Sequence, residues 1–162
     1  MKTTTIDVIH PDEINLNTLS SLINNANIEC GIDQEEIYIL NHYDYPVYLQ
    51  IDSEIHGIYF NCYLGIKKDA SLNELAFFVK KLNDEITYCN FNFNKSENGR
   101  IQIGGSSMYS YYYGVHIDSL LYQIQMFIDR FVAGCFEDES GSFVTYDDEG
   151  HIMNMNTISE LK

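Results

Sequence analysis

Two stretches near the middle of the chain alternate apolar and polar side chains, and this alternation constrains the fold more than any other feature. Residues 45–52 and 55–64 both carry it, with an aliphatic, Phe or Cys side chain at every second position from Val47 and from Ile58 onward. Successive side chains of a β-strand point to opposite faces of a sheet. The pattern therefore predicts antiparallel strands with one buried face. The residues expected on that face are Val47, Leu49, Ile51, Ile58, Phe60, Cys62 and Leu64.

Apolar residues spaced three and four apart predict three helices around these strands. The first spans about residues 15–27, with Asn15 or Asn17 as its N-cap. The second starts at Ser71, because Ser71 and Glu74 form a capping box that satisfies backbone amides at a helix start. The third starts near Asp118, which is its expected N-cap.

The remaining β-like segments complete the sheet. The expected strands are 37–40, 87–93, 101–104 and 108–115. Asn98-Gly99 predicts a tight hairpin turn, and Gly104-Gly105 predicts a bulge or bend that interrupts the last strand. The order is α-β-β-β-α-β-β-α, an α+β fold with the helices packed on one face of a single antiparallel sheet.

The length of 162 residues fits one domain, which we expect to occupy residues 1–136. Residues 137–162 form an acidic extension in which Lys162 is the only basic residue. Within it, residues 143–146 and 151–153 fit a terminal β-hairpin. A disordered acidic tail is an equally good interpretation.

The charge of the chain limits its partners. Asp and Glu number 24 against 9 Lys and Arg, which gives a formal net charge of −15. Binding to phosphate backbones depends mostly on cationic contacts, so nucleic acid and anionic membranes are not expected partners. The first residues carry no export signal and no apolar run is long enough to span a membrane, so we expect a cytoplasmic protein.

No motif for catalysis, a cofactor or a metal ion is visible. Gly104-Gly105-Ser106-Ser107-Met108 lacks the last glycine of a G-x-S-x-G nucleophile turn, and no two histidines have the spacing of metal ligands. The cysteines are far apart in sequence, so we expect reduced, buried thiols at Cys30, Cys62, Cys89 and Cys135. We therefore expect no enzyme, no cofactor and no metal, although two carboxylates that meet only in space would escape this search.

The segments LNTLSSLINNANIEC, IHGIYFNCYLGIKKDA and ELAFFVKKLNDEITYCNFNFNKSENGRIQI carry a resemblance to a known family. In the last of them a helix that ends at Leu82-Asn83 feeds a strand, a short turn with Gly99 and another strand. In this order and spacing the chain resembles the YbjN family over about residues 15–137. The resemblance implies a fold similar to that of the chaperones of type III secretion systems.

The resemblance also implies a function class. The YbjN family is labelled as bacterial sensory transduction regulators, and its chaperone-like relatives are small, acidic, non-enzymatic dimers that hold other proteins. We therefore expect a non-catalytic binding or regulatory module whose partner is another protein or a second copy in a homodimer. Two alternatives remain: an immunity protein that neutralises a basic secreted toxin, and an enzyme with a cleft that the sequence does not reveal.

Tyrosines mark the candidate binding surface. By strand alternation, the face opposite the aliphatic residues carries Tyr48, Tyr59, Tyr63 and Tyr88, and Tyr112 of the cluster Tyr109–Tyr113 is expected to join it. Tyrosine is common in protein interfaces because it buries a large area and keeps a hydrogen-bonding hydroxyl. The alternative is that these residues merely suit half-exposed strand positions.

Overall fold

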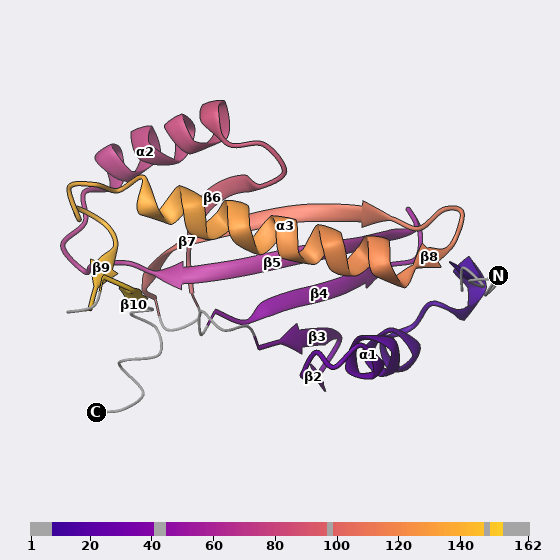
Figure 1. Ribbon diagram of the computed structural model, residues 1–162. Helices are drawn as coiled ribbons and strands as arrows, with labels where there is room; N and C mark the ends of the chain where they lie inside the picture. Colours follow the sequence, from indigo (N-terminus) through magenta and orange to yellow (C-terminus); the bar gives the residue numbers. More distant parts are fainter. Residues whose placement is uncertain (1–7, 41–44, 97–98, 148–149, 154–162) are drawn as a thin grey trace, which may run out of the picture.

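The structure is a computed structural model that describes residues 8–40, 45–96, 99–147 and 150–153. Its centre is an antiparallel sheet of six strands in the order β2-β3-β4-β5-β7-β6 (Figure 1). These strands are β2 (Cys30–Asp33), β3 (Glu36–Ile39), β4 (Val47–Asp52), β5 (Gly57–Gly65), β6 (Asn90–Lys95) and β7 (Ile101–Ser110). The α+β class and the antiparallel sheet predicted from alternation are confirmed.

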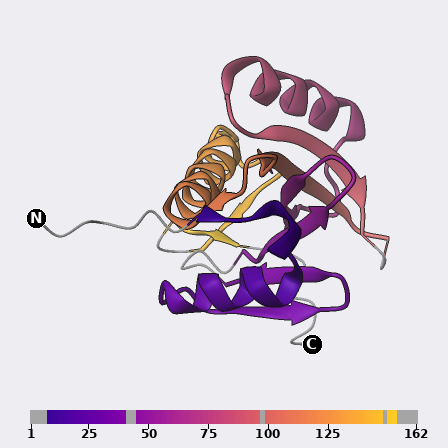
Figure 2. The ribbon, with the colours of Figure 1, turned by 90° about the vertical axis from the view of Figure 1, so that its right-hand side faces the viewer.

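Three helices pack along this sheet: α1 (Leu16–Asn25), α2 (Leu72–Glu85) and α3 (Ile117–Phe136). The α3 helix crosses one face of the sheet (Figure 1). This face carries the aliphatic residues, and on it Phe127 contacts Phe60 and Phe131 stacks on Phe91. The α1 helix covers the same side at β2 and β3, and α2 packs beside β6 (Figure 2). The buried core therefore lies between the helices and one face of the sheet.

The helix caps agree with the sequence in two cases of three. The side chain of Asn15 accepts a hydrogen bond from the Thr18 amide at 3.0 Å, and Ser71 caps α2. The predicted cap of α3 at Asp118 is wrong, because α3 starts at Ile117 and His116 caps it through its ring Nδ1. Asp118 instead lies in the first turn, where its charge complements the helix dipole.

The structure contains short strands that alternation did not predict. The first is β2, the edge strand next to β3, whose Cys-Gly-Ile-Asp sequence has a low strand propensity. A second sheet pairs β1 (Val8–Ile9) with β8 (Val115–His116), and the turn η1 (Pro11–Glu13) leads from β1 into α1. Pairing with β1 fixes His116 directly before α3, which explains why the helix starts earlier than predicted.

The β7 strand runs through Gly104 and Gly105 in unbroken register with β5, so the predicted bulge or bend is wrong. Glycine is instead favoured at these positions because a Cβ atom would collide with a neighbouring side chain. A Cβ at Gly105 would lie 2.4 Å from Cδ2 of Phe131 in the core, and one at Gly104 would lie 2.5 Å from Oδ1 of Asn92 on the opposite face. The two glycines thus let side chains approach the sheet closely from both sides.

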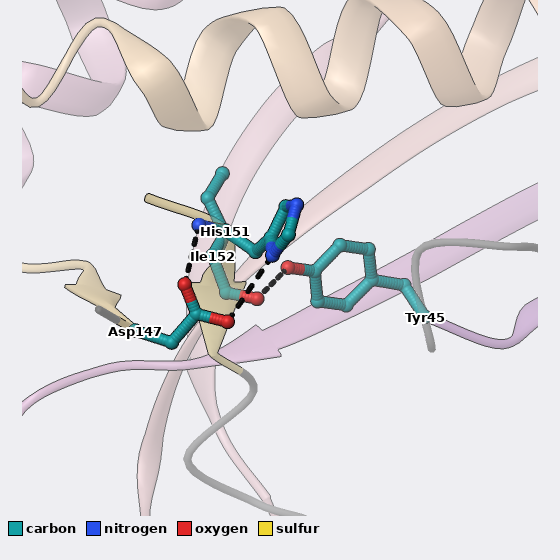
Figure 3. A network of polar contacts seen from close by, with 4 residues as sticks. All are labelled: Tyr45, Asp147, His151 and Ile152. Carbon is teal, nitrogen blue, oxygen red and sulfur yellow. Dashed lines mark hydrogen bonds and ion pairs between the residues drawn. The ribbon is translucent and has the colours of Figure 1, made fainter. Parts of the chain in front are cut away.

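After α3, part of the acidic extension is ordered as the hairpin β9 (Thr145–Tyr146) and β10 (Ile152–Met153). The Tyr45 hydroxyl donates to the Ile152 carbonyl, while Asp147 accepts from the His151 amide at 2.8 Å (Figure 3). Phe143, Val144 and Ile152 are buried in the main core. Within the described residues, 145–146 pair with 152–153 as a hairpin, and residues 154–162 lie outside the described part of the chain.

Candidate protein-binding face

Four tyrosines lie together on the sheet face that points away from α3. Tyr38 of β3 pairs with Tyr48 of β4, and Tyr59 and Tyr63 lie two positions to either side of Asn61 of β5, which pairs with Tyr48. The rings of Tyr48 and Tyr63 are in contact, with centroids 6.2 Å apart. We call the surface formed by Tyr38, Tyr48, Tyr59 and Tyr63 the tyrosine face.

Glycines allow two of these rings to lie close to the backbone of a neighbouring strand. A Cβ at Gly31 would lie 2.4 Å from the Tyr38 hydroxyl oxygen, so the Tyr38 ring extends over β2. A Cβ at Gly104 would lie 3.3 Å from Cδ1 of Tyr63, so that ring borders β7. All four tyrosines are half-buried although no described helix lies over them, because they pack on the sheet and Tyr48 and Tyr63 also pack on each other.

Uncharged polar groups and one methionine lie beside the tyrosines on β4, β5, β6 and β7. Across the sheet, Gln50 pairs with Tyr59 and Tyr59 with Met108, which is 46% exposed. The neighbouring row continues from Tyr48 through Asn61 and Ser106, and Asn90, Asn92 and Asn94 of β6 point to the same side. The described helices contact the other face or the β6 edge and leave this surface uncovered (Figure 2).

The hydroxyls of Tyr48 and Tyr63 remain protonated at neutral pH. Burial raises the pKa of Tyr48, and the nearby Glu36 carboxylate raises it further. The same two causes raise the pKa of Tyr63. Both hydroxyls are therefore available to donate and to accept hydrogen bonds from a binding partner.

The structure brings together three of the five tyrosines predicted for this surface: Tyr48, Tyr59 and Tyr63. Tyr88 precedes β6 instead of lying in it, with a φ of 67° that ends the strand alternation and a side chain that is 72% exposed. Tyr112 follows β7 in a turn, is 64% exposed and packs edge-on against His56 at 5.4 Å. The predicted strand positions of Tyr88 and Tyr112 are therefore wrong.

The cluster Tyr109–Tyr113 divides between core and surface. Tyr109 and Tyr111 are buried in the core, whereas Tyr113 is exposed beside Tyr112. Two residues of the face were missed by sequence reasoning. Tyr38 follows from the alternation of β3, which places Ile37 and Ile39 in the core, but Met108 was hidden by the expected interruption of β7.

The thiols lie away from this face. Cys62, Cys89 and Cys135 are free and buried, and burial raises the pKa of Cys89 to about 12. Cys30 is also a free thiol and is half-buried near Ser20. In the part of the chain that the structure describes, no three His, Cys, Asp or Glu side chains are grouped to hold a metal ion, and no helix is long and apolar enough to span a membrane.

Comparison with known proteins supports the architecture. No family model matches the chain, and no curated protein matches it in sequence. Among solved structures, the chain is similar to YbjN from E. coli, described as a candidate transcription regulator, with a TM-score of 0.67. This chain has the YbjN fold. The match covers 80% of this chain and 95% of YbjN at 12% sequence identity, so it establishes the fold and not a shared function.

Proposed function

We propose that this protein is a non-catalytic binding or regulatory module that works by holding a protein partner against its tyrosine face. The observation that carries the proposal is a sheet face with four half-buried tyrosines that the described helices leave open. The YbjN fold supports it, because YbjN is described as a candidate regulator. We also propose a cytoplasmic location, because YbjN is described as a candidate transcription regulator.

The composition of the face favours a protein over a small molecule. Tyrosine together with serine, glycine and asparagine is the combination that antibody paratopes use, because tyrosine supplies rigid contact area and the small polar residues supply adaptable hydrogen bonds. Here Tyr48 and Tyr59 are next to Asn61, Ser106 and Gly104 on one continuous surface. Met108 adds a flexible apolar contact of the kind enriched in protein interfaces.

The test is a double substitution on the face with a matched control. Tyr59→Ala with Tyr63→Ala removes two central rings, and we expect each change to weaken partner binding by roughly 1 to 4 kcal/mol. Tyr122→Ala is the control, because Tyr122 is exposed on α3 away from the face. Partners captured from the source cells are quantified by mass spectrometry for wild type and both variants, with thermal melts alongside.

Loss of the same captured protein in the double variant, and its retention in Tyr122→Ala, supports the proposal. Equal capture by all three proteins contradicts it. Light scattering of the wild type and the double variant tests a second copy as the partner. If the wild type is a dimer and the double variant is a monomer, the homodimer interface lies on this face. A monomeric wild type excludes a homodimer.

A further inference from the structure

The charged side chains on the tyrosine face are acidic. Glu36, Asp33 and Asp52 occupy face positions of β3, β2 and β4. The one lysine in a described strand of the sheet, Lys95, shares the other side of β6 with Phe91 and Phe93. The remaining described cations lie in helices, loops or turns outside the strands.

Glu36 is the acid nearest the centre of the face. Its carboxylate accepts a hydrogen bond from the side-chain amide of Gln50, the residue that pairs with Tyr59. Glu36 also precedes Tyr38 by two residues, so both side chains lie on the same side of β3. Its effect on the pKa of Tyr48 and Tyr63 agrees with this position, since a carboxylate disfavours ionisation of a nearby hydroxyl.

We propose that the partner held by the tyrosine face is cationic and places an arginine or lysine side chain over Tyr48 and Tyr63, with Glu36 as its counter-ion. The inference rests on the proposed function and names the chemistry of the partner. The aromatic ring face attracts a cation, and an adjacent carboxylate adds a second attraction that the uncharged residues of the face do not oppose. The net charge of −15 steers such a partner toward the protein.

The same charges disfavour a second copy of the chain as the occupant. A two-fold symmetric interface brings the same patch of both subunits together. Glu36, Asp33 and Asp52 of one copy would then lie near the same acids of the other copy, and the described strands place no lysine or arginine on this face to pair with them. A cationic partner would instead meet the opposite charge of these acids on the face.

The probe is the peptide acetyl-(Gly-Arg)₃-amide, and its control is the peptide with citrulline, a neutral isostere, in place of arginine. Each is titrated into protein labelled at the tyrosine rings while NMR spectra are recorded. We expect the arginine peptide to shift the ring signals of Tyr48 and Tyr63, and Glu36→Gln to weaken its binding roughly 3- to 30-fold. Glu74→Gln removes the same charge from the exposed start of α2 and should leave the affinity unchanged.

Equal ring-signal shifts with the citrulline peptide overturn the inference. Equal losses of peptide affinity in Glu36→Gln and Glu74→Gln, or signal shifts confined to tyrosines outside the face, also overturn it. Thermal melts of both variants show whether the fold is intact. The proposed function fails separately, when Tyr59→Ala with Tyr63→Ala leaves partner capture unaffected. If partner capture depends on these tyrosines but is unchanged by Glu36→Gln, only the inference of a cationic partner is ruled out.

Discussion

Asn83 of α2 binds the backbone of Phe91 in the edge strand β6 through both ends of its side-chain amide. Its Oδ1 accepts from the Phe91 amide at 2.7 Å, and its Nδ2 donates to the Phe91 carbonyl at 2.8 Å. Asn24 of α1 makes the same pair of contacts with Cys30 of β2, the other edge, at 3.3 and 3.5 Å. At both edges, an asparagine from the preceding helix occupies backbone groups that would otherwise be open to another strand.

Replacing these asparagines should cost stability in proportion to the quality of the contacts. Asn83→Ala removes two short hydrogen bonds and leaves the Phe91 backbone groups without them, so we expect a loss of about 1–3 kcal/mol. Asn24→Ala should cost less, because its contacts with Cys30 are longer and exposed. Urea unfolding measures both. A larger loss for Asn24→Ala would contradict the role assigned to Asn83.

The two adjacent glycines of β7 should respond differently to the same substitution. In Gly105→Ala the new methyl group would meet the buried ring of Phe131, so we expect a loss of about 1–3 kcal/mol. In Gly104→Ala the nearest atom is the end of the exposed Asn92 side chain, which can move away, so the loss should be smaller. The free energies of unfolding of the two variants test this order, and equal losses would mean that the assigned faces are wrong.

The buried thiols should make the protein less stable in alkaline solution. Burial raises the pKa of Cys89 from 9.0 to about 12, so between these pH values the unfolded chain releases a proton that the folded protein keeps. The stabilisation is complete below pH 9 and is lost as pH rises toward 12, at about 1.4 kcal/mol per pH unit. Urea melts from pH 8 to 10 under reducing conditions should show a shallower decline for Cys89→Ala. Identical declines would contradict the predicted effect of Cys89.

Asp138 organises the start of the C-terminal segment. It is 3% exposed, and its carboxylate accepts from the backbone amides of Ser142, Phe143 and Val144 at 3.0, 2.7 and 2.8 Å. Asp138→Ala removes a charged acceptor from buried donors and should cost about 2–3 kcal/mol. Glu139→Ala changes an exposed neighbour and serves as the control. Thermal melts that rank the two variants equally would show that this turn contributes little.

The sequence predicted the parts of the fold that depend on local periodicity. Alternation over 45–52 and 55–64 placed the core face of β4 and β5, and the Ser71 capping box marked the start of α2. Of the strands that were missed, β1 depends on pairing with β8, which is distant in sequence, whereas β2 pairs with the next strand, β3, through a short turn. The edge strand β2 contains Gly31, which carries no side chain of its own, and it is completed by Tyr38 lying over that glycine.

The candidate site was predicted where strand alternation continues and missed where it stops. Tyr48, Tyr59 and Tyr63 share a face because β4 and β5 are regular, whereas the positive φ of Tyr88 and the turn after β7 remove Tyr88 and Tyr112 from it. A glycine in a strand can mark either a bend in the strand or the close approach of another group to its backbone, and a sequence alone does not distinguish the two cases. At Gly104 and Gly105, side chains approach the backbone closely and the strand does not bend. Because β7 therefore continues without interruption, Met108 lies on the same side as the tyrosines.

Site-specific photo-crosslinking tests the central claim, that the tyrosine face holds the partner, most directly. Benzoylphenylalanine is introduced at Gln50, an exposed residue within the face, or at Gln125, an exposed residue on α3, and cells of the source organism are irradiated. We predict a discrete protein adduct from position 50 that is absent from position 125 and is lost when Tyr59→Ala and Tyr63→Ala are added. Adducts from position 125 with none from position 50 would contradict the claim.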